Sequence, residues 1–245
     1  GGAAGGGCHT WGEGDWEWDV GVHYVGEMGR QTLNKTLLDQ ICQGQVEWAP
    51  HEDAFDVIQL GYGSEARTYP VATGLQAWKD LLHKQFQRET KAITKYFELL
   101  EASTNTSIIH MALKIIPLWI VRSIIYTSIL KYFLQIFRPE FTTTCSQDLV
   151  EGLTCDKDLQ AVLLYCWGNY GTPPSRSNFT MHGACVRHIM KQGAFYPVGG
   201  SSEMALNIVP VIEAAGGRVL VRASVTEILS SGNKVCGVRV GRGRG

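Results

Sequence analysis

The chain has 245 residues, of which 44% are hydrophobic and 18% charged, so it can form one large domain or two small ones, and disorder along the whole chain is excluded. Lys plus Arg number 22 and Asp plus Glu 23, and this near-neutral balance excludes a global field that attracts nucleic acid. Near the C-terminus Arg239, Arg242 and Arg244 lack interleaved aromatic residues, so we expect no nucleic-acid partner. Seven cysteines without a CxxC pair favour buried thiols over a disulfide framework or a zinc cage.

Short strands are expected in the first part of the chain. Residues 1–10 are rich in glycine and predict a loop. Directly afterwards, apolar and polar residues alternate over 16–24, which predicts a half-buried strand. Two more strands, 55–60 and 66–69, flank a glycine-bearing turn and predict a hairpin.

Helices are expected in the middle of the chain. Apolar residues recur there at three- and four-residue spacing, over 31–42, 75–100, 108–137, 157–168 and 178–191. Near the C-terminus the pattern predicts a further helix over 202–215, which runs directly into a strand over 218–221. Two last strands, 225–229 and 235–240, flank a turn.

Strands thus gather at both ends of the sequence, with helices between them. This order favours a mixed fold, α/β or α+β, in which one domain is built from the two ends. We expect residues 1–26 and 193–245 to form that domain, and residues 27–192 to form a helix-rich insert that binds substrate or associates with a membrane.

The most hydrophobic stretch of the chain covers residues 108–137. Lys114, Arg122 and Lys131 interrupt it, so no uncharged run approaches the roughly 20 residues of a spanning helix, and Pro117 breaks the helix. With its basic and aromatic residues, this stretch fits a helix that lies in a membrane interface. A buried helix pair that covers a large pocket would give the same pattern.

Two glycine-bearing stretches are candidates for binding a phosphate or a ribityl chain. Gly5–Gly7 precede Cys8, His9 and Thr10, and residues 193–202 end at the start of the predicted helix 202–215. A flexible linker and a plain turn with an N-cap are the alternative interpretations.

A third candidate is a possible metal site on the predicted helix 178–191. His182, Cys185 and His188 share one face of that helix. Their spacing matches no zinc pattern and brings no carboxylate with it, so packing histidines are favoured and we expect no metal.

Four blocks of sequence are similar, in order and spacing, to the FAD-dependent oxidoreductases of the phytoene desaturase, carotenoid isomerase and retinol saturase group. The blocks are 5–10, 18–26, 195–203 and 214–228, and the similarity extends over residues 5–240. The resemblance implies a partial FAD-binding domain built from both ends of the chain. The helical insert would line a tunnel for a polyene with Trp167, Tyr170 and Phe179.

The same resemblance implies roles for individual residues. The ribityl and phosphate side of FAD would contact Gly5, Gly6, Cys8, His9 and Thr10, and the adenine would contact the backbone of Val225. The strand nearest the isoalloxazine would carry Asp19, Gly21 and His23. The return into the FAD domain would carry Tyr196, Gly199 and Gly200. His23 and Tyr196 are candidate catalytic proton donors.

The resemblance further implies reduction of a double bond in all-trans-retinol or a related polyene lipid, with NAD or NADP as a possible source of electrons. It implies a membrane surface as partner and the endoplasmic reticulum membrane as location. Two alternatives stay open: a carotenoid desaturase or isomerase, and a catalytically inactive, membrane-associated lipid-binding protein. The family's G-x-G-x-x-G strand-turn-helix does not precede Gly5, so we expect a truncated piece that is inactive and holds FAD poorly by itself.

Overall fold

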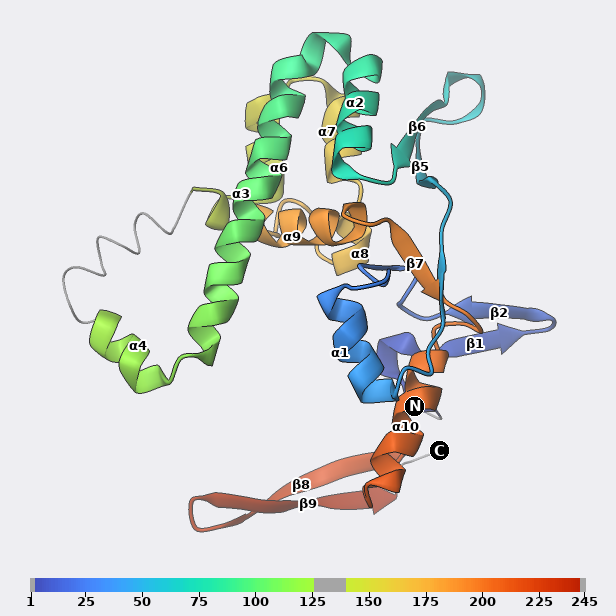
Figure 1. The fold of residues 1–245 in the computed structure, drawn as a ribbon, viewed down its shortest axis with the longest axis vertical. Helices are drawn as coiled ribbons and strands as arrows, with labels where there is room; N and C mark the ends of the chain where they lie inside the picture. The colour runs from blue at the N-terminus through green and yellow to red at the C-terminus, as the bar shows by residue number, and fades with distance from the viewer. Residues whose placement is uncertain (1–2, 126–139, 243–245) are drawn as a thin grey trace. The chain divides into compact units, whose positions relative to one another are not determined.

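The computed structural model describes residues 3–125 and 140–242, with side chains except those of 105–113, 121, 124–125, 140 and 242. It mixes helices and strands, so the expected α+β class is confirmed. The chain divides into two compact units, which Figure 1 shows in one view. We call residues 1–50 with 195–245 the terminal unit and residues 51–194 the central unit.

Within its described residues, the terminal unit contains three small sheets and two helices. Its first hairpin pairs β1 (Thr10–Glu13) with β2 (Trp16–Asp19). A three-stranded sheet has the order β3 (Val25–Gly26), β7 (Ala194–Pro197), β4 (Trp48–Pro50). A second hairpin pairs β8 (Ala223–Ser231) with β9 (Lys234–Arg242). The helices α1 (Leu33–Cys42) and α10 (Glu203–Ala214) contact each other, and a 3-10 turn, η1, covers Gly6–Cys8.

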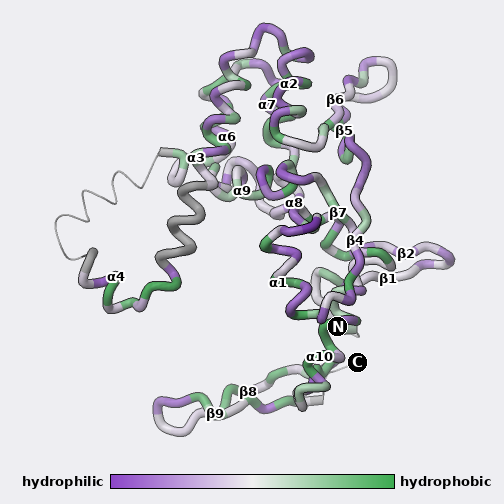
Figure 2. The backbone as a smooth tube through the Cα atoms, in the orientation of Figure 1, coloured by the Kyte–Doolittle hydropathy of each residue, from purple (hydrophilic) through white to green (hydrophobic). Residues whose placement is uncertain are grey.

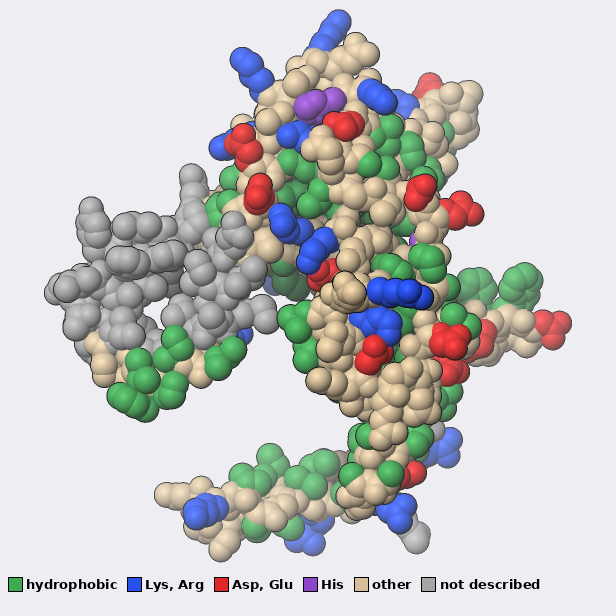
Figure 3. Space-filling model, viewed as in Figure 1, with side chains coloured by type: hydrophobic (Ala, Val, Ile, Leu, Met, Phe, Trp, Pro, Cys, Tyr) green, Lys and Arg blue, Asp and Glu red, His purple; other side chains and the backbone are tan. Residues whose placement is uncertain are grey.

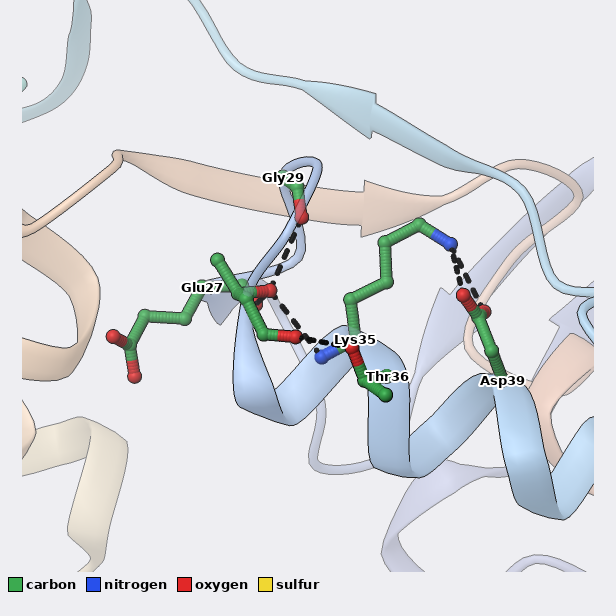
Figure 4. A network of polar contacts seen from close by, with 6 residues as sticks. Glu27, Gly29, Lys35, Thr36 and Asp39 are labelled. Carbon is green, nitrogen blue, oxygen red and sulfur yellow. Dashed lines mark hydrogen bonds and ion pairs between the residues drawn. The ribbon is translucent and has the colours of Figure 1, made fainter.

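Helix α1 begins where Thr32 caps it (Figure 4). The Thr32 hydroxyl accepts a hydrogen bond from the Lys35 amide and donates to the carbonyl oxygens of Glu27 and Gly29. Further along, Lys35 Nζ lies 2.7 Å from a carboxylate oxygen of Asp39, one turn later. An N-cap of this kind satisfies an otherwise unpaired amide, which explains why the helix starts at residue 33.

Where the structure describes it, the central unit is a helical bundle with one hairpin, β5 (Ala54–Leu60) and β6 (Arg67–Ala72). Its helices are α2 (Leu75–Gln85), α3 (Thr90–Ile115), α4 (Leu118–Ile125), α6 (Ser146–Leu153), α7 (Lys157–Leu164), α8 (Trp167–Tyr170) and α9 (Phe179–Met190), with short 3-10 turns at Gly63–Glu65, Gln87–Glu89 and Glu140–Thr142. One apolar cluster forms the core, and Trp78, Tyr96 and Phe179 are its largest fully buried side chains.

Several predicted elements are confirmed: the hairpin of β5 and β6, helices α1, α9 and α10, and the hairpin of β8 and β9. The strand predicted over 16–24 is confirmed only over Trp16–Asp19, and the rest of the prediction is wrong. Its partner β1 begins at Thr10, a residue that was assigned to the loop. The confirmed strand is not half-buried either, since Trp16 is 71% exposed. Alternation along a strand reports its two faces but not whether another layer covers one of them.

The long predicted helices are interrupted. The helix predicted over 75–100 breaks at Phe86, and its second part continues as α3. The helix predicted over 108–137 ends at Ile115 and restarts as α4 beyond Pro117, which cannot donate an amide to a continuous helix. Residues 126–139 of that prediction lie outside the described residues.

Two segments were assigned wrongly or missed. Residues 218–221 were predicted to be a strand, but they pair with no strand that the structure describes. Their apolar run is short, and such a run forms a strand only where a neighbouring strand can pair with it. Helix α6 was missed, because its eight residues are too few to show a clear helical period. No helix of the described ranges is long and apolar enough to cross a membrane.

Candidate functional site

A cavity of about 630 Å³ lies in the terminal unit, between the glycine-rich opening loop and the segment that leads into β8. Its lining residues are Ala3, Ala4, Gly5, Gly6, His9 and Val219–Ser224. The two ends of the chain therefore share one site. Small-molecule sites in proteins have volumes of about 300–1,000 Å³, so this cavity is large enough for part of a cofactor.

The start of α10 anchors the opening loop. Ser202 Oγ accepts a hydrogen bond from the Thr10 amide at 3.0 Å and lies 2.8 Å from Thr10 Oγ1. The buried Ser201 donates its hydroxyl to the Cys8 carbonyl at 3.2 Å. Cys8 and Thr10 thus hold the loop in place from behind, whereas Gly5, Gly6 and His9 face the cavity.

Two glycines allow other segments of the chain to lie close to the backbone of this loop. Gly5 has a φ of +125°, and a Cβ there would lie 3.4 Å from the Ala205 Cβ in α10. A Cβ on Gly21 would lie 3.1 Å from the carbonyl oxygen of Gly7. Side chains at these positions would strain the loop, so glycine keeps its backbone close to α10 and to the segment after β2.

A carboxylate and a phenol meet beside the loop. The Tyr196 hydroxyl donates a hydrogen bond of 2.6 Å to Asp19 Oδ2, while the buried Asp19 Oδ1 has no hydrogen-bond partner among the described residues. Burial, and then the hydrogen bond to Asp19, raise the pKa of Tyr196 to about 12. The phenol therefore keeps its proton throughout the neutral range.

The remaining predicted site residues do not line the cavity. Gly199 and Gly200 have positive φ angles and lead into α10, and a Cβ on Gly200 would lie 4.0 Å from the Tyr196 hydroxyl. Val225 is exposed and directly follows the lining segment. His23 is exposed in the loop between β2 and β3 and does not line the cavity.

One residue of the site was missed by the sequence analysis. Arg222 lines the cavity and adopts a left-handed backbone conformation with a φ of 54°. A guanidinium next to exposed glycine backbone suits a phosphate-bearing ligand. The sequence signal for this site residue was an arginine directly after the apolar run 219–221. Because that run was assigned to a strand, the arginine was not identified as a site residue.

The histidine motif of α9 belongs to the core of the central unit. His182 is fully buried; its Nε2 lies 2.9 Å from the Tyr96 hydroxyl and donates to the Leu163 carbonyl, and its Nδ1 accepts from Tyr170 at 3.1 Å. Burial lowers the pKa of His182 to about 4, so the ring is neutral. Among the described residues, no group of three His, Cys, Asp or Glu side chains is placed to hold a metal.

The tunnel residues expected in the insert also differ from the prediction. Phe179 is fully buried in the apolar core, and the Tyr170 ring packs edge-on against the His182 ring. Both residues stabilise the helical bundle. Trp167 is exposed on α8.

Comparison with known proteins reveals relatives along nearly the whole chain. No protein-family model matches it. The chain is 38% identical, over 98% of its length, to the all-trans-retinol 13,14-reductases of Macaca fascicularis and Homo sapiens. The resemblance to retinol reductases is confirmed. The chain spans 39% of the length of these reductases.

The similarity to retinol reductases runs through both units, since the match to the human protein covers 241 residues. It therefore includes segments that line the cavity as well as the helical core. A further relative, from Danio rerio, is named an inactive all-trans-retinol 13,14-reductase and is 33% identical over 92% of the chain. Similarity at this level accordingly includes proteins named as reductases and a protein named as an inactive reductase.

Proposed function

We propose that this chain forms part of an FAD-dependent oxidoreductase that saturates the 13,14 double bond of all-trans-retinol. The observation that carries the proposal is the 38% identity, over 98% of the chain, to proteins named for that reaction. The cavity of the terminal unit adds independent support, because it joins the glycine loop to the segment before β8.

The residues around the cavity fit a dinucleotide cofactor. Gly5 and Gly6 leave backbone accessible to a phosphate or a ribityl chain, and Arg222 supplies a positive charge on the same lining. We assign Gly5, Gly6 and His9 to the ribityl and phosphate side of FAD, and the backbone of Val225 to the adenine. FAD, when bound, supplies the hydride-transfer chemistry.

Polar groups of the chain itself would then hold the proton that the substrate takes up. Tyr196 holds a proton at its hydroxyl and donates it to Asp19 in a hydrogen bond of 2.6 Å, so the hydroxyl must turn away from Asp19 to protonate a substrate. A phenol with a pKa of about 12 can deliver a proton only to a strongly basic, developing carbanion. Tyr196 is half-buried beside the loop, whereas His23 is exposed, so we favour Tyr196 as the proton donor.

The proposal extends to location and electron source. We place the protein at the surface of the endoplasmic reticulum membrane, where a polyene alcohol dissolves in lipid, and name NADH or NADPH as the possible reductant. All-trans-retinol is apolar along most of its length, so delivery from a bilayer avoids the cost of transfer through water.

The test uses the protein that contains this chain, purified and incubated anaerobically with all-trans-retinol and NADPH or NADH. We expect a product heavier by two hydrogens, and bound flavin visible in the absorbance spectrum. Arg222→Glu is expected to lower flavin occupancy, whereas Arg88→Glu, an exposed arginine of the central unit, leaves it unchanged. Full turnover without any flavin would overturn the cofactor assignment.

The second candidate function is that of a catalytically inactive protein that binds lipid. The Danio rerio relative named as inactive favours it. The two candidates differ in one measurement, because an inactive protein would bind retinol without forming the reduced product.

A further inference from the structure

Helix α3 leaves the core of the central unit along its length. Ile93, Tyr96 and Leu100, in its first half, are buried, whereas Lys114 and Ile115, at its C-terminal end, are exposed. Figure 1 shows that this end extends beyond α9 before the chain turns into α4. The turn falls at Ile116 and Pro117, where the helix cannot continue.

Large apolar side chains are exposed at this turn in close succession. Ile115 is 86% exposed, Leu118 64% and Trp119 70%, and Ile116 is also exposed. Figure 2 shows a hydrophobic trace here, and Figure 3 shows hydrophobic side chains gathered at α4. Single exposed apolar residues are ordinary on protein surfaces, but a contiguous group marks an interaction site.

The charged side chains in the sequence around this turn have one sign. Residues 102–139 contain no Asp or Glu, although the chain's 23 acidic residues in 245 would place about three or four in a stretch of that length. Lys114 and Arg122 flank the apolar turn, and both are exposed. Such a surface complements negatively charged lipid headgroups, and each basic residue near such a membrane adds about 1 kcal/mol of attraction.

The polar backbone groups of the turn are partly satisfied inside the segment. The Ile120 amide donates to the Pro117 carbonyl at 2.9 Å, and Ser123 Oγ donates to the Trp119 carbonyl at 2.8 Å. Internal hydrogen bonds lower the cost of moving a backbone out of water. Tryptophan is enriched at the depth of the headgroups, where its ring is amphipathic.

We propose that residues 114–123, the insertion segment, enter one leaflet of an anionic membrane at the level of the headgroups. Ile115, Leu118 and Trp119 would contact the acyl boundary, and Lys114 and Arg122 the lipid phosphates. A protein partner would also cover apolar side chains, but the uniform positive charge favours lipid. This inference does not depend on retinol reduction.

Vesicle flotation of the full chain tests the proposal. We expect binding to vesicles of phosphatidylcholine with roughly a quarter phosphatidylserine, weak binding to phosphatidylcholine alone, and release by salt. Lys114→Glu with Arg122→Glu is expected to lower the partition coefficient at least about 20-fold. Leu118→Asp with Trp119→Asp is expected to lower it at least about 10-fold.

Matched controls separate the insertion segment from exposure or charge in general. Tyr62→Asp changes a ring that is 91% exposed in the same unit, and Lys84→Glu with Arg88→Glu reverses two exposed charges near α2. Both controls are expected to bind vesicles like the unchanged chain. Circular dichroism and thermal unfolding verify that every variant is folded.

Trp119→Phe gives a second readout that keeps the segment apolar. Brominated lipid is expected to quench tryptophan fluorescence in the unchanged chain, and this quenching is expected to fall in Trp119→Phe while vesicle binding persists. The proposal is overturned if the unchanged chain ignores anionic vesicles, if the folded charge or aspartate variants bind normally, or if Trp119→Phe is quenched as strongly as before.

Discussion

At the scale of single residues, His182 illustrates how the helical core treats a polar side chain. The ring is surrounded by Tyr96, Tyr170 and Phe179. Its two nitrogens contact groups of the central unit: the hydroxyls of Tyr96 and Tyr170, the Leu163 carbonyl and the Cys166 thiol. Its neutral form satisfies both nitrogens, with a proton on Nε2 and an acceptor at Nδ1. A buried imidazole in this state orders the crossing of α9 with its neighbours and is poorly suited to exchange protons with a substrate.

Acid is expected to destabilise the chain through His182. The pKa of His182 is about 4 in the folded chain against an ordinary value of 6.5. Between pH 6.5 and 4, His182 therefore binds a proton in the unfolded chain but not in the folded chain. Stability should therefore fall as the pH drops from 6.5 to 4, by roughly 3 kcal/mol in total. Urea unfolding at a series of pH values measures this loss.

Substitution of His182 distinguishes its contribution to the pH dependence of stability from the contributions of other titrating groups. His182→Phe removes two hydrogen bonds and should unfold more easily at pH 7, but its stability should vary less between pH 6.5 and 4. His23→Gln, which alters an exposed histidine, should keep the slope of the unchanged chain. An unaltered slope in His182→Phe would contradict the assignment.

Tyr196 and His23 are expected to differ in their contribution to retinol reduction. If Tyr196 is the proton donor of retinol reduction, Tyr196→Phe should lower kcat by about 10²-fold or more, while His23→Phe should leave it within about 2-fold. Steady-state kinetics on the protein that contains this chain measures both. The opposite ranking would move the proton donor to His23.

At the scale of elements, the crossing of α3 and α9 depends on a small residue. A Cβ on Gly183 would lie 2.1 Å from Ser103 Oγ and 3.1 Å from Ser103 Cβ. Ser103 is fully buried and donates to the Leu100 carbonyl, so it has little room to move. The two helices approach this closely because Gly183 has no side chain.

Gly183→Ala is therefore expected to destabilise the central unit by about 1–3 kcal/mol, since it overpacks a close helix contact. Gly152→Ala in α6 is the matched control, because its Cβ meets no atom within 4 Å. There, the better helix propensity of alanine should leave stability unchanged or raise it by up to about 1 kcal/mol. Thermal unfolding compares the two, and equal melting temperatures would argue against the tight crossing.

At the scale of the whole molecule, burial is unequal between the two units. The large apolar cluster belongs to the central unit, whereas the buried apolar residues described in the terminal unit are few: Met28, Cys42, Val46 and Pro197. The hairpin of β8 and β9 leaves Ile228 and Val238 exposed. Burial of apolar area is the dominant stabilising contribution, so the units should differ in local stability.

Hydrogen exchange is expected to show this difference directly. Amides of β8 and β9 should exchange about 10²-fold faster, or more, than those of α3 and α9 around Tyr96 and His182. Trp78→Ala should speed exchange in the central helices, because loss of a large core side chain costs about 3–5 kcal/mol. Equal acceleration in β8 and β9 would show that the two units unfold together.

The sequence by itself determined the elements with strong local signals. The apolar spacing of 31–42 predicted α1, the glycine turn predicted the hairpin of β5 and β6, and the β-branched runs predicted β8 and β9. These features depend on neighbours a few residues away. The family resemblance likewise followed from the order of short blocks along the chain.

Only the tertiary structure decided which residues meet. It joined Gly5, Gly6 and His9 to Arg222 around one cavity, paired Asp19 with Tyr196, and left His23 exposed. It also buried Phe179 and His182 in a core rather than along a tunnel. Contacts between distant segments depend on packing and on which faces are covered, and periodicity along the chain carries no information about either.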